Sequence, residues 1–596
     1  MYTPLRTKQS GKTIRFSSQT PVSGEKLDVY EGLLNPNQAL SITNYLPLAP
    51  GRLQKRKGQL KVIDLVGSSP VLHLDRYTSN VLIFSYANTT AVYNEDTGVT
   101  TSVKTDWTTG TLYAGVRYGD YYFLCNGKDK IVRISQTLAY DAQSANFTAG
   151  KLLTGATSGA TAVILSDADG GATGTLTLGS VTGVFADNEV ITDNNGTPGS
   201  ATVNGTLAYV ATTISAAPIC SHLEVLNARL IASNLSTDSA ACQYSAVDTG
   251  TNPPFDTWSN TTVATAGGIV RDGKAGAISH TEILGDIVVN FAQYGKWAFR
   301  IDQLDVGGTL TKIDQTVIDI TDLGGFSALM TDKGVFSVNK AGVQLTVSLG
   351  QSNIAFSQQS FNVSTALDAA YFEGIDLNGS TIAYDRVQEL LYVSCRKSSS
   401  SNNYIIVHNT NTKAFARIEG WNIASFFMDV DGSIWGGSAT STKIYKLFTN
   451  NDDDGTNIRT DYYQPINVGD PNNNRSLQKF MVQAELSPST VLTLGFDKVM
   501  ANGELSANVN TYQMVAQHGV STQTGWGEMG WGEGYGESVA TEPASCYDTC
   551  KPRIANYHDI RVRVTSEDRV PHTINLFTAD VKETRPIRQR TITQVS

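Results

Sequence analysis

Short apolar runs, each ended by a polar turn, recur along the chain from about residue 60 to residue 450. The runs are rich in Val, Ile, Tyr, Phe and Thr, and Gly, Asn or Asp interrupts them at intervals of roughly 8 to 12 residues. Asn126 and Gly127, between the runs 120–125 and 130–134, suit a tight hairpin because a type I′ turn needs positive φ at both central residues. The pattern predicts antiparallel strands arranged as a sandwich, a barrel or a propeller.

One unit of this pattern repeats with variation. It consists of a strand, a polar turn, a second strand, a short turn and a further strand that ends near an aromatic residue, as at 223–245, 283–300, 389–408 and 425–447. Such a unit is typical of a propeller blade. At roughly 40 to 50 residues per blade, residues 65–450 without the segment 145–207 hold about six to eight blades, and the long loops favour six.

Residues 145–207 have a different texture, with few large aromatic residues and many Gly, Ala and Thr. They contain their own repeat, since 147–154 resembles 185–192 and 159–163 resembles 199–203. Apolar and polar residues alternate at 174–178, which favours an ordered strand. We expect a small β-module that is inserted in an early blade and projects outwards. The alternative is a low-complexity loop.

The pattern changes again after the polar cluster at 450–455. Strong alternation follows at 479–486, 490–496, 558–564 and 572–577, which predicts a separate antiparallel sandwich. The expected fold class is therefore all-β, a propeller of about six blades with an inserted β-module and a C-terminal β-sandwich. The expected boundaries are an N-terminal extension that joins the propeller or an interface at 1–64, first blades at 65–144, the module at 145–207, remaining blades at 208–450 and the sandwich at 451–596.

Composition supports this fold class and narrows the function. Charged residues make up 17% of the 596 residues, and the remaining polarity comes largely from Gly, Ser, Thr and Asn, which are poor in helix interiors. The net charge of −10 argues against a protein that wraps nucleic acid, because such binding needs Lys and Arg to neutralise phosphates. It leaves open a channel through which DNA passes. Neither a membrane-spanning apolar run nor a signal peptide is expected, so we expect synthesis in a cytoplasm.

The motifs that could carry chemistry have stronger structural explanations. Residues 525–530 match G-x-G-x-x-G, but no strand precedes them and no helix follows. The acidic clusters at 167–170, 429–432 and 452–455 lack the final Glu of a calcium loop and suit turns. We expect no catalytic residue, no cofactor site and no metal site, and the chain is not expected to be an enzyme. A spatial pair of glycosidase carboxylates would leave no motif, so a carbohydrate-active enzyme is the weakest alternative.

Cysteine and histidine offer little more. Six cysteines are too few for a disulfide scaffold, and free thiols are expected, with the oxidation state of Cys546 and Cys550 left open. Those two cysteines with His558 form at most half a zinc site, since no second Cys/His pair lies near them in the sequence. The seven histidines are scattered singly along the chain.

Two segments are candidate interfaces. The Gly/Trp tract at 525–537 predicts an aromatic contact with a neighbouring subunit or domain, or packing on its own chain. The basic stretch at 52–61 predicts docking on an acidic partner or on a nucleic-acid backbone, or else a solvated strand. If its three consecutive cations dock a partner, reversing them to Glu should block assembly and leave the monomer folded. The candidate interface residues are Arg52, Leu53, Lys55, Arg56, Lys57, Trp526, Trp531 and Tyr535.

The N-terminal passage resembles a known family. Asn37-Gln38, then Asn44-Tyr45, then residues 50–58 are similar to the opening of bacteriophage tail nozzle proteins, the tail tubular B type of short-tailed phages. In that family an N-Q…N…G-L-x-K-R-P-G-like segment leads into a β-propeller; Lys57 stands here in place of the usual Pro, and the early Gly-Gly-Ile-Ser-like segment is missing.

The resemblance implies a structural virion protein of the phage tail. Such a protein is a six-fold homo-oligomer that continues the DNA channel below the portal and adaptor, contacts other tail proteins, and retains the genome until ejection. Double-stranded DNA passes through without sequence-specific binding, and no catalytic residues carry over. The alternative function is a receptor-binding adhesin at a tail tip that uses the propeller face and the inserted module.

Overall fold

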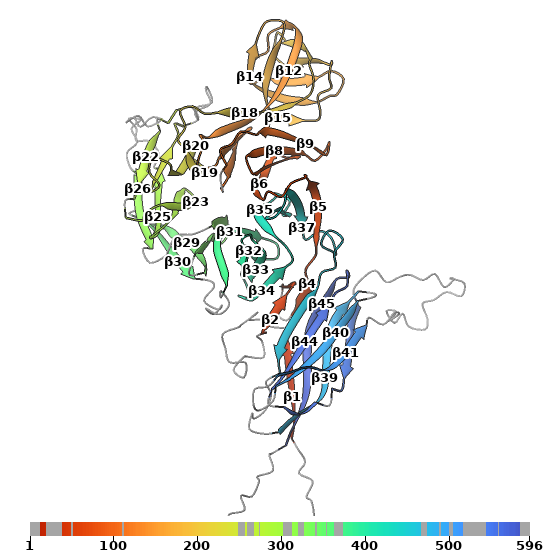
Figure 1. Ribbon diagram of the computed structural model, residues 1–596. Helices are drawn as coiled ribbons and strands as arrows, with labels where there is room; N and C mark the ends of the chain where they lie inside the picture. Colours follow the sequence, from red (N-terminus) through yellow and green to blue (C-terminus); the bar gives the residue numbers. More distant parts are fainter. Residues whose placement is uncertain are drawn as a thin grey trace, which may run out of the picture.

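The chain forms three β bodies that follow one another in space (Figure 1). The structure is a computed structural model, and every regular element in the residues it describes is a strand. None of these residues forms a helix long and apolar enough to cross a membrane. The described residues are 12–19, 39–48, 52–109, 112–247, 257–258, 267–272, 274–301, 313–319, 327–339, 342–352, 355–362, 374–466, 474–487, 490–499, 505–515, 544–552, 554–557 and 559–584.

The central body is a β-propeller whose sheets are arranged around one axis. Each innermost strand lies next to the innermost strands of the two neighbouring sheets, so the ring is closed. Blades 1 to 4 run from the innermost strand outwards as follows: β6 (Val71–Thr78), β7 (Val81–Tyr86), β8 (Thr89–Asn94) and β9 (Val99–Lys104); β10 (Ala114–Tyr118), β11 (Tyr121–Cys125), β12 (Val132–Ala145) and β18 (Ala208–Thr213); β19 (Cys220–Leu226), β20 (Arg229–Leu235), β21 (Ala241–Tyr244) and β22 (Gly268–Arg271); β23 (Ile278–Leu284), β24 (Ile287–Ala292), β25 (Gly295–Ile301) and β26 (Ile313–Asp319).

Three further blades complete the ring. In the same order they are β27 (Ser327–Thr331), β28 (Gly334–Asn339), β29 (Gly342–Ser352) and β30 (Ala355–Asn362); β31 (Ile375–Asp385), β32 (Leu390–Lys397), β33 (Tyr404–Asn409) and β34 (Phe415–Glu419); β35 (Ile423–Met428), β36 (Ile434–Ser438), β37 (Lys443–Leu447) and β5 (Gln59–Asp64). The expectation of about six blades is therefore wrong, because the described strands form seven. Short strands and tight turns, as in blade 1 at 71–104, leave room for one more blade than the long loops suggested.

Blade 7 is closed by a strand from the other end of the propeller sequence. β5 pairs antiparallel with β37, from Gln59 opposite Leu447 to Asp64 opposite Lys443. Ile63 of β5 is buried with Trp435 and Leu82, between blades 7 and 1. The N-terminal segment thereby locks the last blade to the first.

Burial follows from the radial arrangement of the sheets. The middle strands of the blades are covered on both faces by neighbouring blades, so β24 and β28, second in their blades, and β33, third in blade 6, are buried at every position. The outermost strand β9 has no fully buried residue. A separate apolar cluster fills the space between each pair of neighbouring blades.

The segment 145–207 forms a closed barrel inserted between the third and fourth strands of blade 2. The long strand β12 leaves the blade and joins β15, β14, β13, β16 and β17, and β17 pairs back with β12. Leu138, Leu153 and Phe185 are among the residues of its apolar core. The barrel projects from the propeller at the end opposite the sandwich (Figure 1). Its strands are β13 (Leu152–Gly155), β14 (Thr161–Asp169), β15 (Gly174–Thr182), β16 (Val190–Asp193) and β17 (Ser200–Val203).

The third body is a sandwich of two sheets that includes strands from both ends of the sequence. β1 (Lys12–Gln19), β3 (Tyr45–Pro47) and β4 (Leu53–Lys55) share one sheet with β39 (Asn474–Leu486), β42 (Ala544–Cys550), β43 (Ile554–Tyr557) and β45 (His572–Thr584). The other sheet holds β2 (Ser41–Thr43), β38 (Thr460–Pro465), β44 (Asp559–Ser566), β40 (Val491–Val499) and β41 (Leu505–Val515). The segment 1–64 is thus divided between the sandwich and blade 7.

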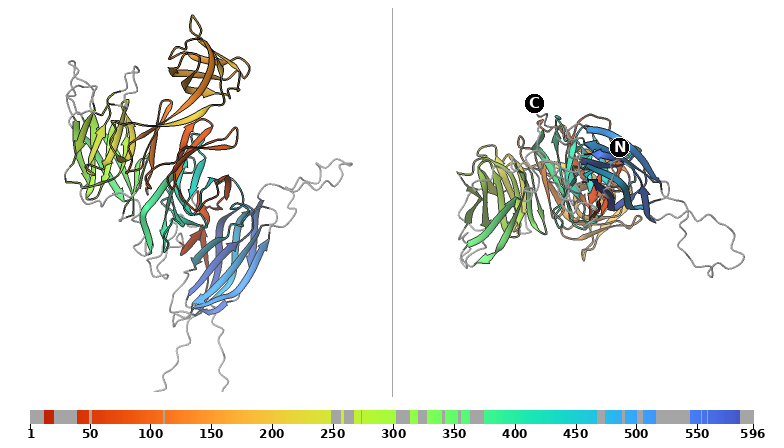
Figure 2. Two further views of the ribbon diagram at one scale, coloured as in Figure 1. Left: turned by 45° about the horizontal axis from the view of Figure 1, so that its top comes forward. Right: turned by 90° about the horizontal axis from the view of Figure 1, so that it is seen from below.

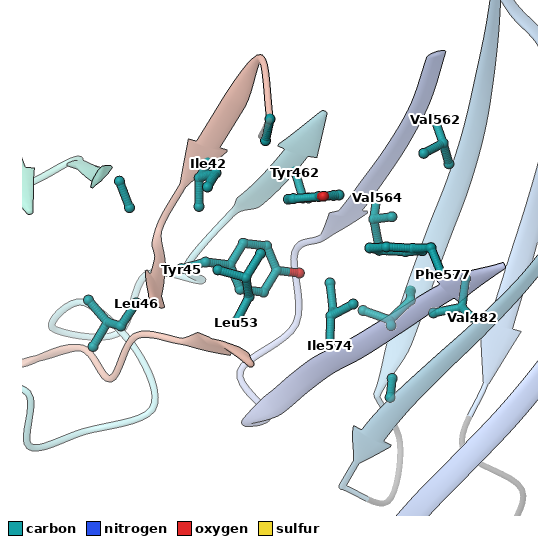
Figure 3. Packing of buried hydrophobic residues seen from close by; sticks show 14 of the residues in the cluster. Ile42, Tyr45, Leu46, Leu53, Tyr462, Val482, Val562, Val564, Ile574 and Phe577 are labelled. Atoms are coloured by element: carbon teal, nitrogen blue, oxygen red, sulfur yellow. The ribbon is translucent and has the colours of Figure 1, made fainter. Parts of the chain in front are cut away.

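The sandwich is joined to the propeller by a continuous sheet and a continuous core. β2 pairs with β34 of blade 6 in parallel, with Thr43 opposite Arg417. One apolar cluster runs from Leu390 and Ile434 in the blades to Phe577 in the sandwich. Figure 3 shows Tyr45, Leu53 and Ile574 side by side in this cluster, and Figure 2 shows the sandwich against the lower blades from two further directions.

Candidate functional site

The basic segment 52–57 lies at the junction between the propeller and the sandwich. Its side chains alternate between surface and interior: Arg52 and Lys57 are exposed, while Leu53, Lys55 and Arg56 are buried. Exposed Arg52 pairs with Glu485, with 2.8 Å between Nη2 and Oε2. Leu53 packs in the shared core described above. The segment therefore does not present one continuous cationic surface.

Arg56 is the centre of a buried hydrogen-bonded cluster. Its two terminal nitrogens donate to the two carboxylate oxygens of Asp453 at 2.8 and 2.6 Å, and Nε donates to Oδ1 of Asn44 at 2.9 Å. Its guanidinium carbon lies 4.3 Å from the centre of the Trp421 ring, and Trp421 Nε1 donates to the same Asp453 carboxylate at 2.7 Å. A bidentate Arg–carboxylate pair stacked on an aromatic ring has a fixed geometry. We call Asn44, Arg56, Trp421 and Asp453 the junction clamp.

Lys55 occupies a second buried site beside the clamp. Its ammonium group lies 3.1 Å from Oδ1 of Asp568, and only 2% of its side chain is exposed. Burial lowers the pKa of Lys55, and the Asp568 carboxylate opposes this shift. Nearby, Tyr45 OH lies 2.8 Å from Nε2 of His572, whose pKa burial lowers to about 4.

The prediction of a cationic docking patch is corrected for two of its members. Lys55 and Arg56 are buried against carboxylates of their own chain, because an unpaired cation at a buried junction would lose its hydration without compensation. Arg52 and Lys57 remain on the surface. The other predicted interface residues, Trp526, Trp531 and Tyr535, lie outside the described residues.

The acidic clusters that could suggest calcium are used by turns and ion pairs. Asp169 accepts from Gly171 N at 2.7 Å, and Asp431 accepts from Ser433 N at 2.7 Å. Asp429 pairs with Arg76. In the part of the chain that the structure describes, no three His, Cys, Asp or Glu side chains converge as a metal site would require. The cysteine side chains that it describes, Cys125, Cys220, Cys242 and Cys395, are buried free thiols.

The propeller channel gathers chemistry that the sequence analysis missed. Three innermost strands carry a His-x-acid pair, which strand alternation places on one face of each strand. The pairs come from blades 1, 3 and 4, so histidines that are isolated in the sequence share one channel. A His-x-[Asp/Glu] search confined to the first strand of each unit would have found them. The pairs are His73 and Asp75 on β6, His222 and Glu224 on β19, and His280 and Glu282 on β23.

Blade 1 contacts blade 2 through a hydrogen-bonded chain. Tyr122 OH donates to Oδ2 of Asp75 at 2.6 Å and lies 2.8 Å from Nε2 of His73. Since the single hydroxyl proton goes to Asp75, the His73 ring must donate from Nε2. Burial raises the pKa of Asp75 to about 6, although the bond from Tyr122 lowers it in part, and burial lowers the pKa of His73 to about 4.

Blade 4 carries a pair of a different kind on β23. Nε2 of His280 lies 3.1 Å from Oε1 of Glu282, and the ring donates from its other nitrogen to the backbone of Ala328. Burial raises the pKa of Glu282 to about 8 and lowers that of His280 to about 4. At neutral pH the carboxyl therefore keeps its proton and donates it to Nε2. The His222 ring meets the His280 ring edge to face, with 4.9 Å between centroids.

A pocket of 880 Å³ occupies the mouth of this channel. The innermost strands of blades 1, 3, 4 and 6 contribute His73, His222, His280 and Thr381 to its walls. Burial lowers the pKa of the three histidines that face it to about 3 or 4, so these rings are neutral at pH 7 and do not concentrate charge. The arrangement is suited to holding a small molecule by hydrogen bonds.

Comparison with known proteins adds little. No family model matches this chain, and no curated protein matches it. A solved structure that it resembles is a chain of the crystal structure of the mitotic checkpoint complex, at 8% sequence identity and a TM-score of 0.30. That match covers 66% of this chain and 95% of the other.

Proposed function

We propose that this chain is a structural subunit of the tail nozzle of a short-tailed bacteriophage. In this role, six copies form a ring below the portal and adaptor that continues the DNA channel, retains the genome and conducts it during ejection. The chain is made in the host cytoplasm and ends in the virion tail. It is not an enzyme and needs no cofactor.

The observation that carries the proposal is the position of the residues that resemble the nozzle family. Asn44, Tyr45 and residues 52–58 build the junction between propeller and sandwich. They do so through contacts with residues hundreds of positions later in the sequence, such as Arg459, Asp453 and His572. Asn44 has a φ of 60°, a conformation that Asn tolerates, and its side chain bonds both Arg56 and the Arg459 carbonyl. If these residues serve to join the propeller to the sandwich, a protein with the same motif is expected to have the same junction.

The net charge of the chain and the small size of its propeller channel favour a DNA path that runs between copies of the chain, not through one propeller. A pocket of 880 Å³ has the size of a small-molecule site, so a duplex would not thread the propeller. The net charge of −10 lowers affinity for phosphate, which suits a conduit that must release DNA.

Imaging of the purified chain with its adaptor tests this proposal. A ring with a central channel and with the chain present in purified particles is the expected result. A chain that stays monomeric at all concentrations with adaptor present, or that is missing from particles, would contradict it.

A receptor-binding adhesin is the second candidate, favoured by the barrel of 145–207. The barrel projects away from the other bodies, and β12 and β18 pair directly at its base from Val132 opposite Thr213 to Thr137 opposite Ala208. The barrel can therefore be replaced by a short turn while blade 2 keeps its four strands. If the adhesin function holds, this deletion abolishes host adsorption and leaves DNA retention intact; if the nozzle function holds alone, adsorption is unchanged.

A further inference from the structure

The mouth of the propeller channel is shaped by irregularities at one level of the ring. Three innermost strands each carry one extra residue, a β-bulge, as their second residue. These residues are Leu72 on β6, Ser279 on β23 and Ala424 on β35. A larger bulge on β31 holds residues 377–380. All three single extra residues line the 880 Å³ pocket, as do Asn378, Gly379 and Ser380. Bulges re-aim side chains and recur beside binding sites.

Two buried polar atoms in the pocket wall have no partner within the chain. His222 is 8% exposed; its ring donates to the backbone of Ser279, and Nε2 is left as an unpaired acceptor. Ser380 is 7% exposed, and its hydroxyl is unpaired. Buried polar groups are nearly always hydrogen-bonded, so these two atoms lack what a ligand could supply.

The rim adds an aromatic face and a guanidinium whose charge is already matched. Tyr294 is 55% exposed and lies against Gly276, where a Cβ would come within 2.9 Å of the ring. Arg396 lies over Gly379 at 2.6 Å from the position of a Cβ, and its Nη1 is 3.4 Å from Asp376. Arg396 is the one residue with a formal charge at neutral pH among the described residues that line the pocket.

This chemistry excludes several classes of ligand. A metal ion would need three converging ligands, which the described residues do not provide. A polyanion would need cations in excess, and the single guanidinium is paired. A wholly apolar ligand would leave His222 Nε2 and the Ser380 hydroxyl without partners.

We propose that the mouth of the propeller channel is a binding site for a neutral saccharide. Sugar hydroxyls both donate and accept, so a saccharide in this pocket can donate to His222 Nε2 or exchange a hydrogen bond with the Ser380 hydroxyl. The C–H face of the sugar packs on the exposed ring of Tyr294. The site belongs to a single propeller and does not depend on the proposed tail function.

Isothermal titration calorimetry on the full chain tests the site with glucose, galactose, N-acetylglucosamine and maltose. Adenosine and inorganic phosphate are the probes for other classes. The expected result is saturable binding of at least one sugar at one site per chain. No binding of any of the four sugars, or binding of adenosine or phosphate in their place, would overturn the proposal.

Variants locate the site. Ser380→Ala removes one hydrogen-bonding atom and should weaken sugar binding by about two- to tenfold. Ala424→Trp fills the mouth and should abolish it, while Val387→Trp on an exposed turn away from the pocket should bind like the wild type. The melting temperature of each variant shows whether it is folded, and Ser380→Ala decides the question should Ala424→Trp fail to fold. Wild-type affinity in folded Ser380→Ala and Ala424→Trp would refute the location.

Discussion

Arg56 and Arg52 stand four residues apart in one basic stretch, and the structure predicts opposite consequences for their loss. Arg56 is 2% exposed and donates to both oxygens of Asp453 as well as to Asn44. In Arg56→Ala the Asp453 carboxylate keeps only the bond from Trp421 at 2.7 Å. The side chain of Arg52 is 52% exposed and holds Glu485 alone at the surface.

The magnitudes follow from burial. Removing one partner of a buried ion pair costs about 3 to 5 kcal/mol, because the remaining charge stays buried without compensation. Loss of an exposed pair costs about 0 to 1 kcal/mol. Since each 1.4 kcal/mol is a factor of about ten, Arg56→Ala should raise the local opening constant of the junction at least about a hundredfold, and Arg52→Ala about fivefold at most.

Hydrogen exchange followed by mass spectrometry measures this opening at the junction itself. Peptides that cover 53–64 contain β4, β5 and the amide of Arg56, which donates to the Asn44 carbonyl at 3.0 Å. A local measurement is appropriate because a chain of three bodies does not unfold in two states. Exchange in Arg56→Ala that is no faster than in Arg52→Ala would refute the assignment of Arg56 as the centre of the junction clamp.

The same structure changes what triple charge reversal would show. Reversing Lys55, Arg56 and Lys57 to Glu places two new carboxylates beside Asp568 and Asp453 inside the chain. The expected outcome is now a damaged junction in the monomer rather than a folded monomer that fails to assemble. Reversal of Arg52 and Lys57 alone is the variant that tests a docking surface.

Three further predictions concern the other parts of the chain. Glu282 has a folded pKa of about 8 against an ordinary value of 4.5, so the folded state holds an extra proton between these values and stability falls as pH rises through this window. Glu282→Gln should remove the part of this fall that Glu282 contributes, while Asp75 and Glu224, whose pKa values burial also raises, still contribute to it. The advantage of the variant in melting temperature should grow from pH 5 to pH 8.5, and a constant difference would contradict the assignment. Ile63→Ala in the closing strand β5 should lower the free energy of unfolding of the propeller by about 2 to 5 kcal/mol. Leu60 is 40% exposed on the same strand, so Leu60→Ala should change this free energy by about 0.5 kcal/mol. Calorimetric melting measures both variants. In the barrel, Glu189 accepts from Ser158 N at 2.9 Å, from Ser158 Oγ at 2.7 Å and from Ala186 N at 2.6 Å. Glu189→Gln should therefore lower the free energy of unfolding of the barrel by about 1.5 to 3 kcal/mol. Proteolysis within 145–207 should become faster, while the melting transition of the propeller stays unchanged.

The local alternation of the sequence was sufficient to predict most of the strands. Asn126 and Gly127 lie in the connection between β11 and β12, but the predicted type I′ turn is wrong: Gly127 has a φ of 74°, whereas Asn126 is not among the residues with positive φ, and the first paired residues are Leu124 and Val132. The run 283–291 spans the first two strands of blade 4, and β24 at 287–292 is continuous and apolar because neighbouring blades cover both its faces. These features depend on residues close in sequence, and the period of two is a local property.

The blade count could not be settled in the same way. Length divided by blade size allowed about six to eight blades, and the choice of six rested on loop length. Closure of the ring requires each blade to pack on two others, and the last blade takes its fourth strand from 59–64. That pairing joins residues hundreds of positions apart, so no local pattern reports it.

The candidate sites show the same division. The sequence identified the cations of 52–57 and the three channel histidines as residue types, and it predicted the all-β class, the inserted module and the sandwich. Only the tertiary structure decided that Arg56 faces Asp453 inside the chain, and that His73, His222 and His280 from three blades share one channel. The physical reason is that strand formation follows from neighbouring side chains, whereas burial and convergence depend on which distant strands pack together.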